Sequence, residues 1–192
     1  MRERRVFLYA LAFELILGVI GVLGGALTGA PALADFRWEL RAPTLGLALT
    51  LPLLAWFALS WRSERPALRE IRVTLERLLP DLLGGLGWPA LLGLSLAAGL
   101  GEEILFRGFV QGSLERATGP AVGLIAASAV FGLAHAITRT YALVATLMAL
   151  YLGAAWRLGG NLLVPITIHA AYDAVVIWTV LSRAVPERRA AD

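Results

Sequence analysis

The amino-acid sequence predicts an all-α protein, a polytopic bundle of about six transmembrane helices with one additional amphipathic helix. The composition, the length of the apolar runs and the position of the arginines lead to this prediction. Of 192 residues, 58% are hydrophobic and 16% are charged, whereas soluble domains are about 45–50% apolar and about 25% charged. So few polar side chains cannot cover the surface of a soluble protein, and we treat residues 1–192 as a single membrane domain.

Six apolar runs are candidates for membrane spans. A spanning helix needs about 20 mostly apolar residues. We expect spans at residues 6–27, 43–61, 87–114, 121–136, 141–156 and 162–181. The first run follows a cluster of arginines, but it is longer than the roughly 7–15 residues of a secretion signal core. We therefore interpret it as an uncleaved span.

Residues 62–81 have a different pattern. Leu68, Ile71 and Leu75 recur at helical spacing among arginines and glutamates, which is typical of an amphipathic helix. Such a helix lies in the membrane interface or forms a solvated linker, and the sequence leaves both alternatives open.

The arginines predict the orientation. With the amino terminus inside, twelve of the 17 basic residues fall on the cytoplasmic side: Arg2, Arg4, Arg5, Arg62, Arg65, Arg69, Arg72, Arg77, Arg139, Arg183, Arg188 and Arg189. Because cytoplasmic loops carry an excess of basic residues, we expect both termini in the cytoplasm. The arginines flank apolar segments rather than forming a basic stripe, so nucleic acid is not an expected partner. The absence of lysine suggests a GC-rich genome and hence a bacterial inner-membrane protein.

Ionisable groups inside the predicted spans are candidates for function, because each costs at least roughly 2.5–3.5 kcal/mol at the membrane centre. They gather in three segments and include both histidines of the chain: Glu102, Glu103, Arg107, His135, His169 and Asp173. Glu14 also interrupts the first span, and we assign it no role.

Helical spacing divides these groups into pairs. Glu103 and Arg107 are four residues apart, so they face each other and can neutralise one another. Glu102 points about 100° away from Glu103 and stays free for chemistry. His169 and Asp173, also four residues apart, share one face of the last span.

Helix lengths predict that Glu102 and His135 meet. Residues 118–120 form a turn between the third and fourth spans. Glu102 lies about 22 Å before this turn, and His135 lies about 21 Å after it, at 1.5 Å per helical residue. In an antiparallel hairpin the two side chains then lie at the same depth. Gly99 and Gly101 precede Glu102 in a segment longer than one span needs, so we expect a kink or tilt there.

Three motifs in these segments resemble the CPBP family, the CAAX protease and bacteriocin-processing (Abi) group of intramembrane endopeptidases. The family's EExxxR, FxxxH and HxxxN/D patterns read here as Glu102-Glu103-Ile-Leu-Phe-Arg107, Phe131-Gly-Leu-Ala-His135 and His169-Ala-Ala-Tyr-Asp173. The resemblance covers residues 94–180, so we place the catalytic core at about 87–181 and treat the spans at 6–27 and 43–61 as accessory.

The resemblance implies an intramembrane metalloendopeptidase. It implies that Glu102 activates the attacking water, that His135, His169 and Asp173 complete the catalytic set, and that Glu103, Arg107 and Phe131 support it. Eukaryotic members cleave prenylated CAAX proteins, and bacterial members are associated with peptide maturation and bacteriocin immunity. The expected partners are therefore a peptide or membrane-protein substrate and the lipid bilayer.

Two hydrolytic mechanisms are open. The chain has no cysteine, so a zinc site would use His135, His169, Asp173 and Glu102, and the ion would lower the pKa of bound water to about 7. We favour this zinc mechanism, since Asp173 adds negative charge where the eukaryotic prenyl proteases have asparagine. In a metal-free mechanism Glu102 is the general base and the histidines stabilise the oxyanion.

Two other functions fit the buried polar groups. Glu, His and Asp side chains also form the relays of proton or ion transporters. A non-catalytic scaffold that binds a membrane protein is the second alternative. The sequence contains no internal repeat of the kind that many transporters have, and a scaffold has no need for the complete polar set, so we favour hydrolysis.

Overall fold

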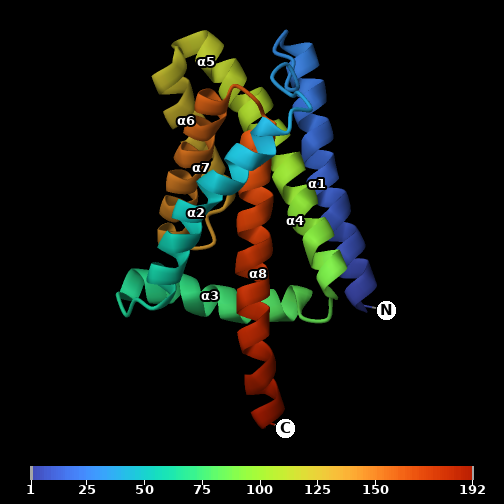
Figure 1. The fold of residues 1–192 in the computed structure, drawn as a ribbon, viewed down its shortest axis with the longest axis vertical. Coiled ribbons are helices and arrows are strands. Elements are labelled where there is room, and N and C mark those ends of the chain that lie inside the picture. Colours follow the sequence, from blue (N-terminus) through green and yellow to red (C-terminus); the bar gives the residue numbers. More distant parts are fainter. Residues whose placement is uncertain (1, 192) are drawn as a thin grey trace.

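The computed structural model describes residues 2–191, with side chains described for residues 4–183, and the described chain forms helices without strands (Figure 1). The helices are α1 (Arg2–Leu27), α2 (Arg41–Trp61), α3 (Pro66–Leu83), α4 (Trp88–Glu103), the π-helical η1 (Ile104–Gln111), α5 (Gly112–Thr118), α6 (Pro120–Ala134), α7 (Arg139–Gly159) and α8 (Leu163–Ala191). The prediction of an all-α bundle is confirmed.

The predicted spans correspond to these helices. Five stretches of the described chain are long and apolar enough to cross a membrane, and the third, Trp88–Thr118, runs through α4, η1 and α5. The fourth predicted span corresponds to α6, which has only 15 residues. Many large apolar side chains are exposed, including Phe13 and Leu23 on α1 at 58% each. Exposed apolar surface on this scale suits contact with lipid, and the chain is an integral membrane protein.

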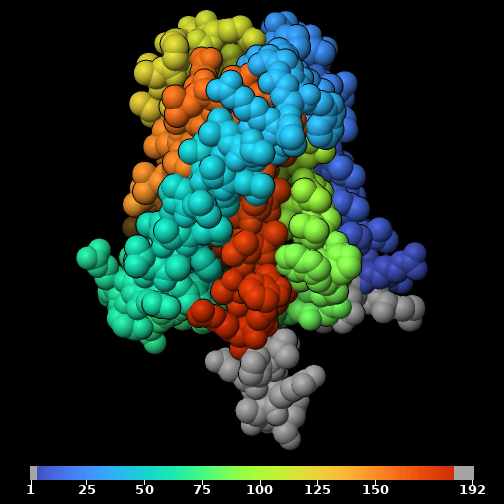
Figure 2. Space-filling model, viewed as in Figure 1, coloured from blue at the N-terminus to red at the C-terminus, as the bar shows by residue number. Residues whose placement is uncertain are grey.

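Helix α8 forms the centre of the bundle (Figure 1). It packs against α4, α2, α3 and α7, and its residues Ile168 and Val180 are completely buried. On the face drawn in Figure 2, α8 comes to the surface in a strip between α2 and α4. The central helix therefore holds His169 and Asp173 within reach of most other helices.

The amphipathic helix predicted at residues 62–81 is α3. It lies crosswise to α8 at one end of the bundle (Figure 1). Its apolar residues Leu75 and Leu79 pack against a core cluster that contains Trp61 and Val180. This crosswise orientation agrees with the interfacial alternative, because a helix in the interface lies in the membrane plane.

The beginning of α1 and the end of α8 lie at the same end of the bundle as α3 (Figure 1). This agrees with the expectation that both termini are on one side of the membrane. That the side is cytoplasmic stays a prediction from the arginines.

The irregularity expected at Gly99 and Gly101 is found elsewhere. Helix α4 is regular through both glycines, and the π-helical segment η1 begins only after Glu103. A Cβ atom at Gly99 would lie 2.9 Å from the carbonyl oxygen of Ile166, and one at Gly101 would overlap the backbone carbonyl of Glu14. The two glycines therefore let α8 and α1 approach α4 closely, and the change in helical winding follows the two glutamates.

We expect Gly101→Ala to destabilise the protein by about 1–3 kcal/mol, because the added methyl forces α1 away from α4. Gly93→Ala is the matched control in the same helix, since a Cβ atom there meets nothing within 4 Å. Thermal unfolding in detergent would compare the two variants. Equal midpoints for Gly101→Ala and wild type would disprove the close approach.

Candidate active site

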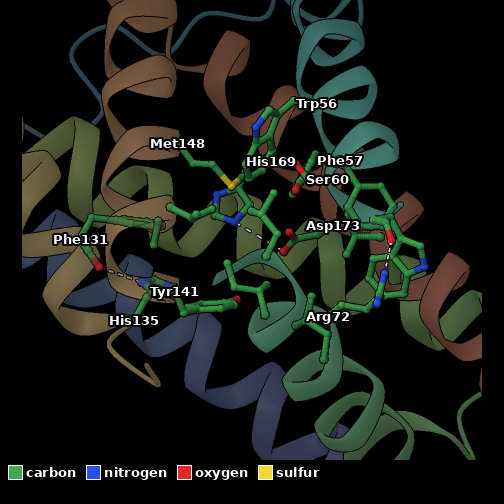
Figure 3. Close-up of a pocket in the computed structure, with 18 of the residues that line it drawn as sticks. Trp56, Phe57, Ser60, Arg72, Phe131, His135, Tyr141, Met148, His169 and Asp173 are labelled. Atoms are coloured by element: carbon green, nitrogen blue, oxygen red, sulfur yellow. Dashed lines mark hydrogen bonds and ion pairs between the residues drawn. The ribbon is translucent and has the colours of Figure 1, made fainter. Parts of the chain in front are cut away.

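A cavity of about 170 Å³ lies beside α3. Its lining includes Glu102, His135, His169 and Asp173, so the structure brings together all four residues predicted to be catalytic. Figure 3 shows His135, His169 and Asp173 among the lining residues. These residues come from α4, from the residue after α6, and from α8. The three sequence motifs therefore converge on one cavity.

Glu102 and His135 form the first pair in this cavity. The Oε2 atom of Glu102 lies 3.6 Å from Nε2 of His135, which confirms that the two residues share one depth. The distance exceeds the 2.7–3.2 Å of an ordinary N–H···O hydrogen bond. Glu102 Oε2 is buried and accepts no hydrogen bond from the described residues. This carboxylate oxygen is thus available as an acceptor beside an imidazole nitrogen.

Phe131 fixes the orientation of His135. The Nδ1 atom of His135 is 2.9 Å from the Phe131 carbonyl oxygen, and the two rings stack with centroids 4.2 Å apart and planes 16° apart. A carbonyl can only accept, so Nδ1 carries the proton in this hydrogen bond. Nε2 is then the ring nitrogen that faces Glu102. The contacts of Phe131 with His135 are the geometric basis for the supporting role predicted for Phe131.

Glu103 is the centre of a buried ionic network. Its Oε1 atom accepts a hydrogen bond from Arg107 Nη1 at 2.9 Å and one from His169 Nδ1 at 2.8 Å. Glu103 is 0% exposed and Arg107 is 2% exposed. The predicted pairing of Glu103 with Arg107 is confirmed. The contact with His169, which joins two helices across 66 positions of sequence, was not predicted.

Arg107 has further partners on neighbouring helices. Its Nη2 atom donates to the Ala149 carbonyl at 3.3 Å, and its guanidinium lies 4.7 Å from the centroid of the Phe131 ring. Cation–π contact and hydrogen bonding together hold the guanidinium in one place. Arg107 therefore links Glu103 to the Phe131–His135 stack.

His169 and Asp173 form the second pair in the cavity. His169 Nε2 lies 3.5 Å from Asp173 Oδ2, as their spacing on one helix predicts. Since Nδ1 donates to Glu103, Nε2 is the nitrogen directed to the cavity side of the ring, toward Asp173 (Figure 3). The imidazole is thus held between two carboxylates.

The four predicted zinc ligands form two pairs, Glu102 with His135 and His169 with Asp173, and are not arranged around a single position. Within residues 4–183, no three His, Asp or Glu side chains are grouped so that they could hold a metal ion. The Nδ1 atom of each histidine is engaged by Phe131 or Glu103, which leaves only the two Nε2 atoms for a metal. A zinc ion here would therefore be bound through the Nε2 atoms, and zinc stays a prediction.

The wall of the cavity was not predicted. Outside the four motif residues it is mainly aromatic and aliphatic, with side chains from α2, α3 and α7: Trp56, Phe57, Trp61, Leu68, Ile71, Leu75, Tyr141, Val144 and Met148. The span at residues 43–61 is therefore more than accessory, because α2 forms part of the cavity. The apolar stripe of residues 62–81 was the one available signal, since its residues Leu68, Ile71 and Leu75 line the cavity.

Arg72 connects two of the helices that form this wall, α2 and α3. Its Nη1 atom donates to the Trp61 carbonyl at 2.7 Å, and Nη2 lies 3.2 Å from the Glu64 carboxylate. These contacts join α3 to the end of α2, so the two helices form one continuous side of the cavity.

Comparison with known proteins agrees with the motifs. Residues 84–175 match the family model described as type II CAAX prenyl endopeptidase Rce1-like. No curated protein and no solved structure shows a significant match to the chain. The matched segment contains Glu102, Glu103, Arg107, Phe131, His135, His169 and Asp173, so the part of the chain that carries all three motifs is similar to the type II CAAX prenyl endopeptidases.

Proposed function

We propose that this protein hydrolyses peptide bonds of membrane-associated substrates, including prenylated or CAAX-like chains, with water activated by Glu102. One observation carries the proposal. The Oε2 atom of Glu102 is buried, accepts no hydrogen bond from the described residues and lies 3.6 Å from His135 Nε2 in the cavity. A carboxylate in this position is a suitable general base.

In the first step, a water molecule held between Glu102 and His135 gives a proton to Glu102. Its oxygen forms a bond to the carbonyl carbon of the substrate, and the carbonyl π electrons move to the oxygen. The resulting oxyanion needs hydrogen-bond donors in fixed positions. In the second step the C–N bond breaks, and the leaving amine takes the proton from Glu102. The products are a new carboxyl terminus and a new amino terminus.

His169 is the first oxyanion donor in this proposal. Protonated on both nitrogens, with its charge balanced by Glu103 and Asp173, it donates from Nε2 into the cavity. Its ring cannot rotate freely, because Nδ1 is bound to Glu103 at 2.8 Å. Glu103 and Arg107 thus act through His169 and are positioning residues.

The apolar wall supports a membrane-associated substrate. Trp56 and Phe57 on α2 and Leu75 on α3 line the cavity beside the polar pairs. Such a wall can hold an apolar side chain or a prenyl group, while the peptide bond reaches Glu102. The proposed location is the bacterial inner membrane with both termini in the cytoplasm, which the distribution of arginines supports.

A peptide-cleavage assay tests this function. The purified protein in detergent is incubated with quenched fluorescent CAAX-type peptides, prenylated and unprenylated, and separately sealed in vesicles with a proton gradient. We expect cleavage and no loss of the gradient. Loss of the gradient without cleavage would instead indicate a transporter, and inertness in both assays would indicate a scaffold.

Zinc is tested in the same assay by adding a chelator and measuring the metal content of the protein. The metal-free mechanism predicts unchanged cleavage after chelation. If chelation abolishes cleavage and added Zn²⁺ restores it, the zinc mechanism is correct.

A further inference from the structure

Tyr141 is a cavity residue that belongs to none of the three motifs. It lies in the first turn of α7 and lines the cavity together with Glu102, His135, His169 and Asp173. Figure 3 shows its ring next to His135, with the hydroxyl oxygen directed into the cavity. A phenol group thus stands among the residues that the proposed reaction uses.

The backbone connects the position of Tyr141 to that of His135. The NH of Ile137 donates to the carbonyl oxygen of His135 at 2.8 Å, which tightens the link after α6. The hydroxyl of Thr138 then caps α7 by accepting a hydrogen bond from the Tyr141 NH at 3.1 Å. This cap stabilises the first turn of α7, so the backbone of Tyr141 has a defined position relative to His135.

The Tyr141 hydroxyl does not hold two parts of the fold together. It makes no hydrogen bond to another residue of the described chain. Tyr151, almost three turns further along α7, differs: its hydroxyl donates to the Leu49 carbonyl at 2.7 Å and so binds α7 to α2. The hydroxyl of Tyr141 is therefore available to a ligand in the cavity.

During amide hydrolysis a negative charge develops on the carbonyl oxygen of the substrate. Acyl-transfer sites usually stabilise this oxyanion with more than one hydrogen-bond donor. His169 supplies one donor, and Arg107 and Glu103 are buried behind it. A phenol donates a hydrogen bond while remaining neutral, so it adds no net charge at this depth in the membrane. We propose that the Tyr141 hydroxyl is a catalytic residue, the second hydrogen-bond donor to the oxyanion. This inference rests on the proposed function.

The test compares Tyr141→Phe with Tyr151→Phe, which removes a hydroxyl from the same helix outside the cavity. We expect Tyr141→Phe to lower kcat by about 10²- to 10³-fold with little change in KM, as for loss of an oxyanion donor. Tyr151→Phe should keep kcat close to wild type. Thermal unfolding of both variants shows whether either change acts through the fold.

Binding of a peptidyl phosphonate, whose charged oxygens imitate the oxyanion, provides a readout that needs no turnover. Tyr141→Phe should weaken this binding by about as much as it lowers kcat/KM. If wild type cleaves peptides through Glu102 and Tyr141→Phe matches it in kcat and phosphonate affinity, this inference alone is wrong. If wild type neither cleaves peptides nor binds the phosphonate, the inference fails together with the proposed function.

Discussion

Glu102→Gln lowers kcat for peptide cleavage by about 10²- to 10⁴-fold, the usual contribution of a general base. Glutamine has the same shape, but its amide does not accept a proton from water. The protein should fold normally, because Glu102 Oε2 makes no hydrogen bond within the described residues that the substitution would break. Steady-state kinetics with a fluorescent peptide measures the effect, and a thermal unfolding scan checks the fold.

Glu115→Gln is the matched control for Glu102→Gln. Glu115 is also buried, at 8% exposed, and it belongs to the same continuous helical stretch, Trp88–Thr118. It pairs with Gln111 and Arg157, away from the cavity. We expect this control to retain kcat even if it loses stability. Equal activity of Glu102→Gln and wild type would refute the role of Glu102 as the base.

Arg107→Met destabilises the protein by about 3–5 kcal/mol, the typical result of removing one partner of a buried ion pair. Glu103 would be left at 0% exposure with its charge uncompensated except by His169. Chemical unfolding in detergent measures the loss. Glu39→Gln is the exposed counterpart, because the Arg37–Glu39 pair is half exposed and such pairs contribute about 0–1 kcal/mol.

The double variant Glu103→Leu/Arg107→Met separates stability from catalysis. Replacing both ions by apolar side chains removes the uncompensated charge, so much of the lost stability should return. Activity should not return, because His169 Nδ1 has lost its acceptor. Arg107→Met as stable as wild type, or a double variant with full activity, would contradict the proposed network.

Much of the site follows from positions along single helices. Glu103 with Arg107, and His169 with Asp173, are pairs four residues apart, and this spacing alone places both members on one face. Glu102 and His135 required one more step, the comparison of two helix lengths on either side of a turn at residues 118–120. That step succeeded because an antiparallel hairpin leaves little freedom in depth.

Spacing along a helix does not predict the contacts between helices that are distant in sequence. Spacing shows which face of α8 carries His169, but not that Glu103 lies opposite it. For the same reason, the sequence did not predict that α2 and Tyr141 line the cavity. The kink expected at Gly99 and Gly101 is absent from α4 for a related reason: the sequence does not show that α8 and α1 approach these two glycines closely.

The central claim is that water held by Glu102 attacks the peptide bond directly, in the cavity where the three motifs meet. Intact-mass spectrometry of substrate and protein during a single turnover in lipid nanodiscs tests it most directly. We predict two peptide fragments whose masses sum to the substrate plus one water, no change in the mass of the protein, and no fragments from Glu102→Gln. A substrate that stays intact, or a protein that gains the mass of an acyl fragment, would contradict the mechanism.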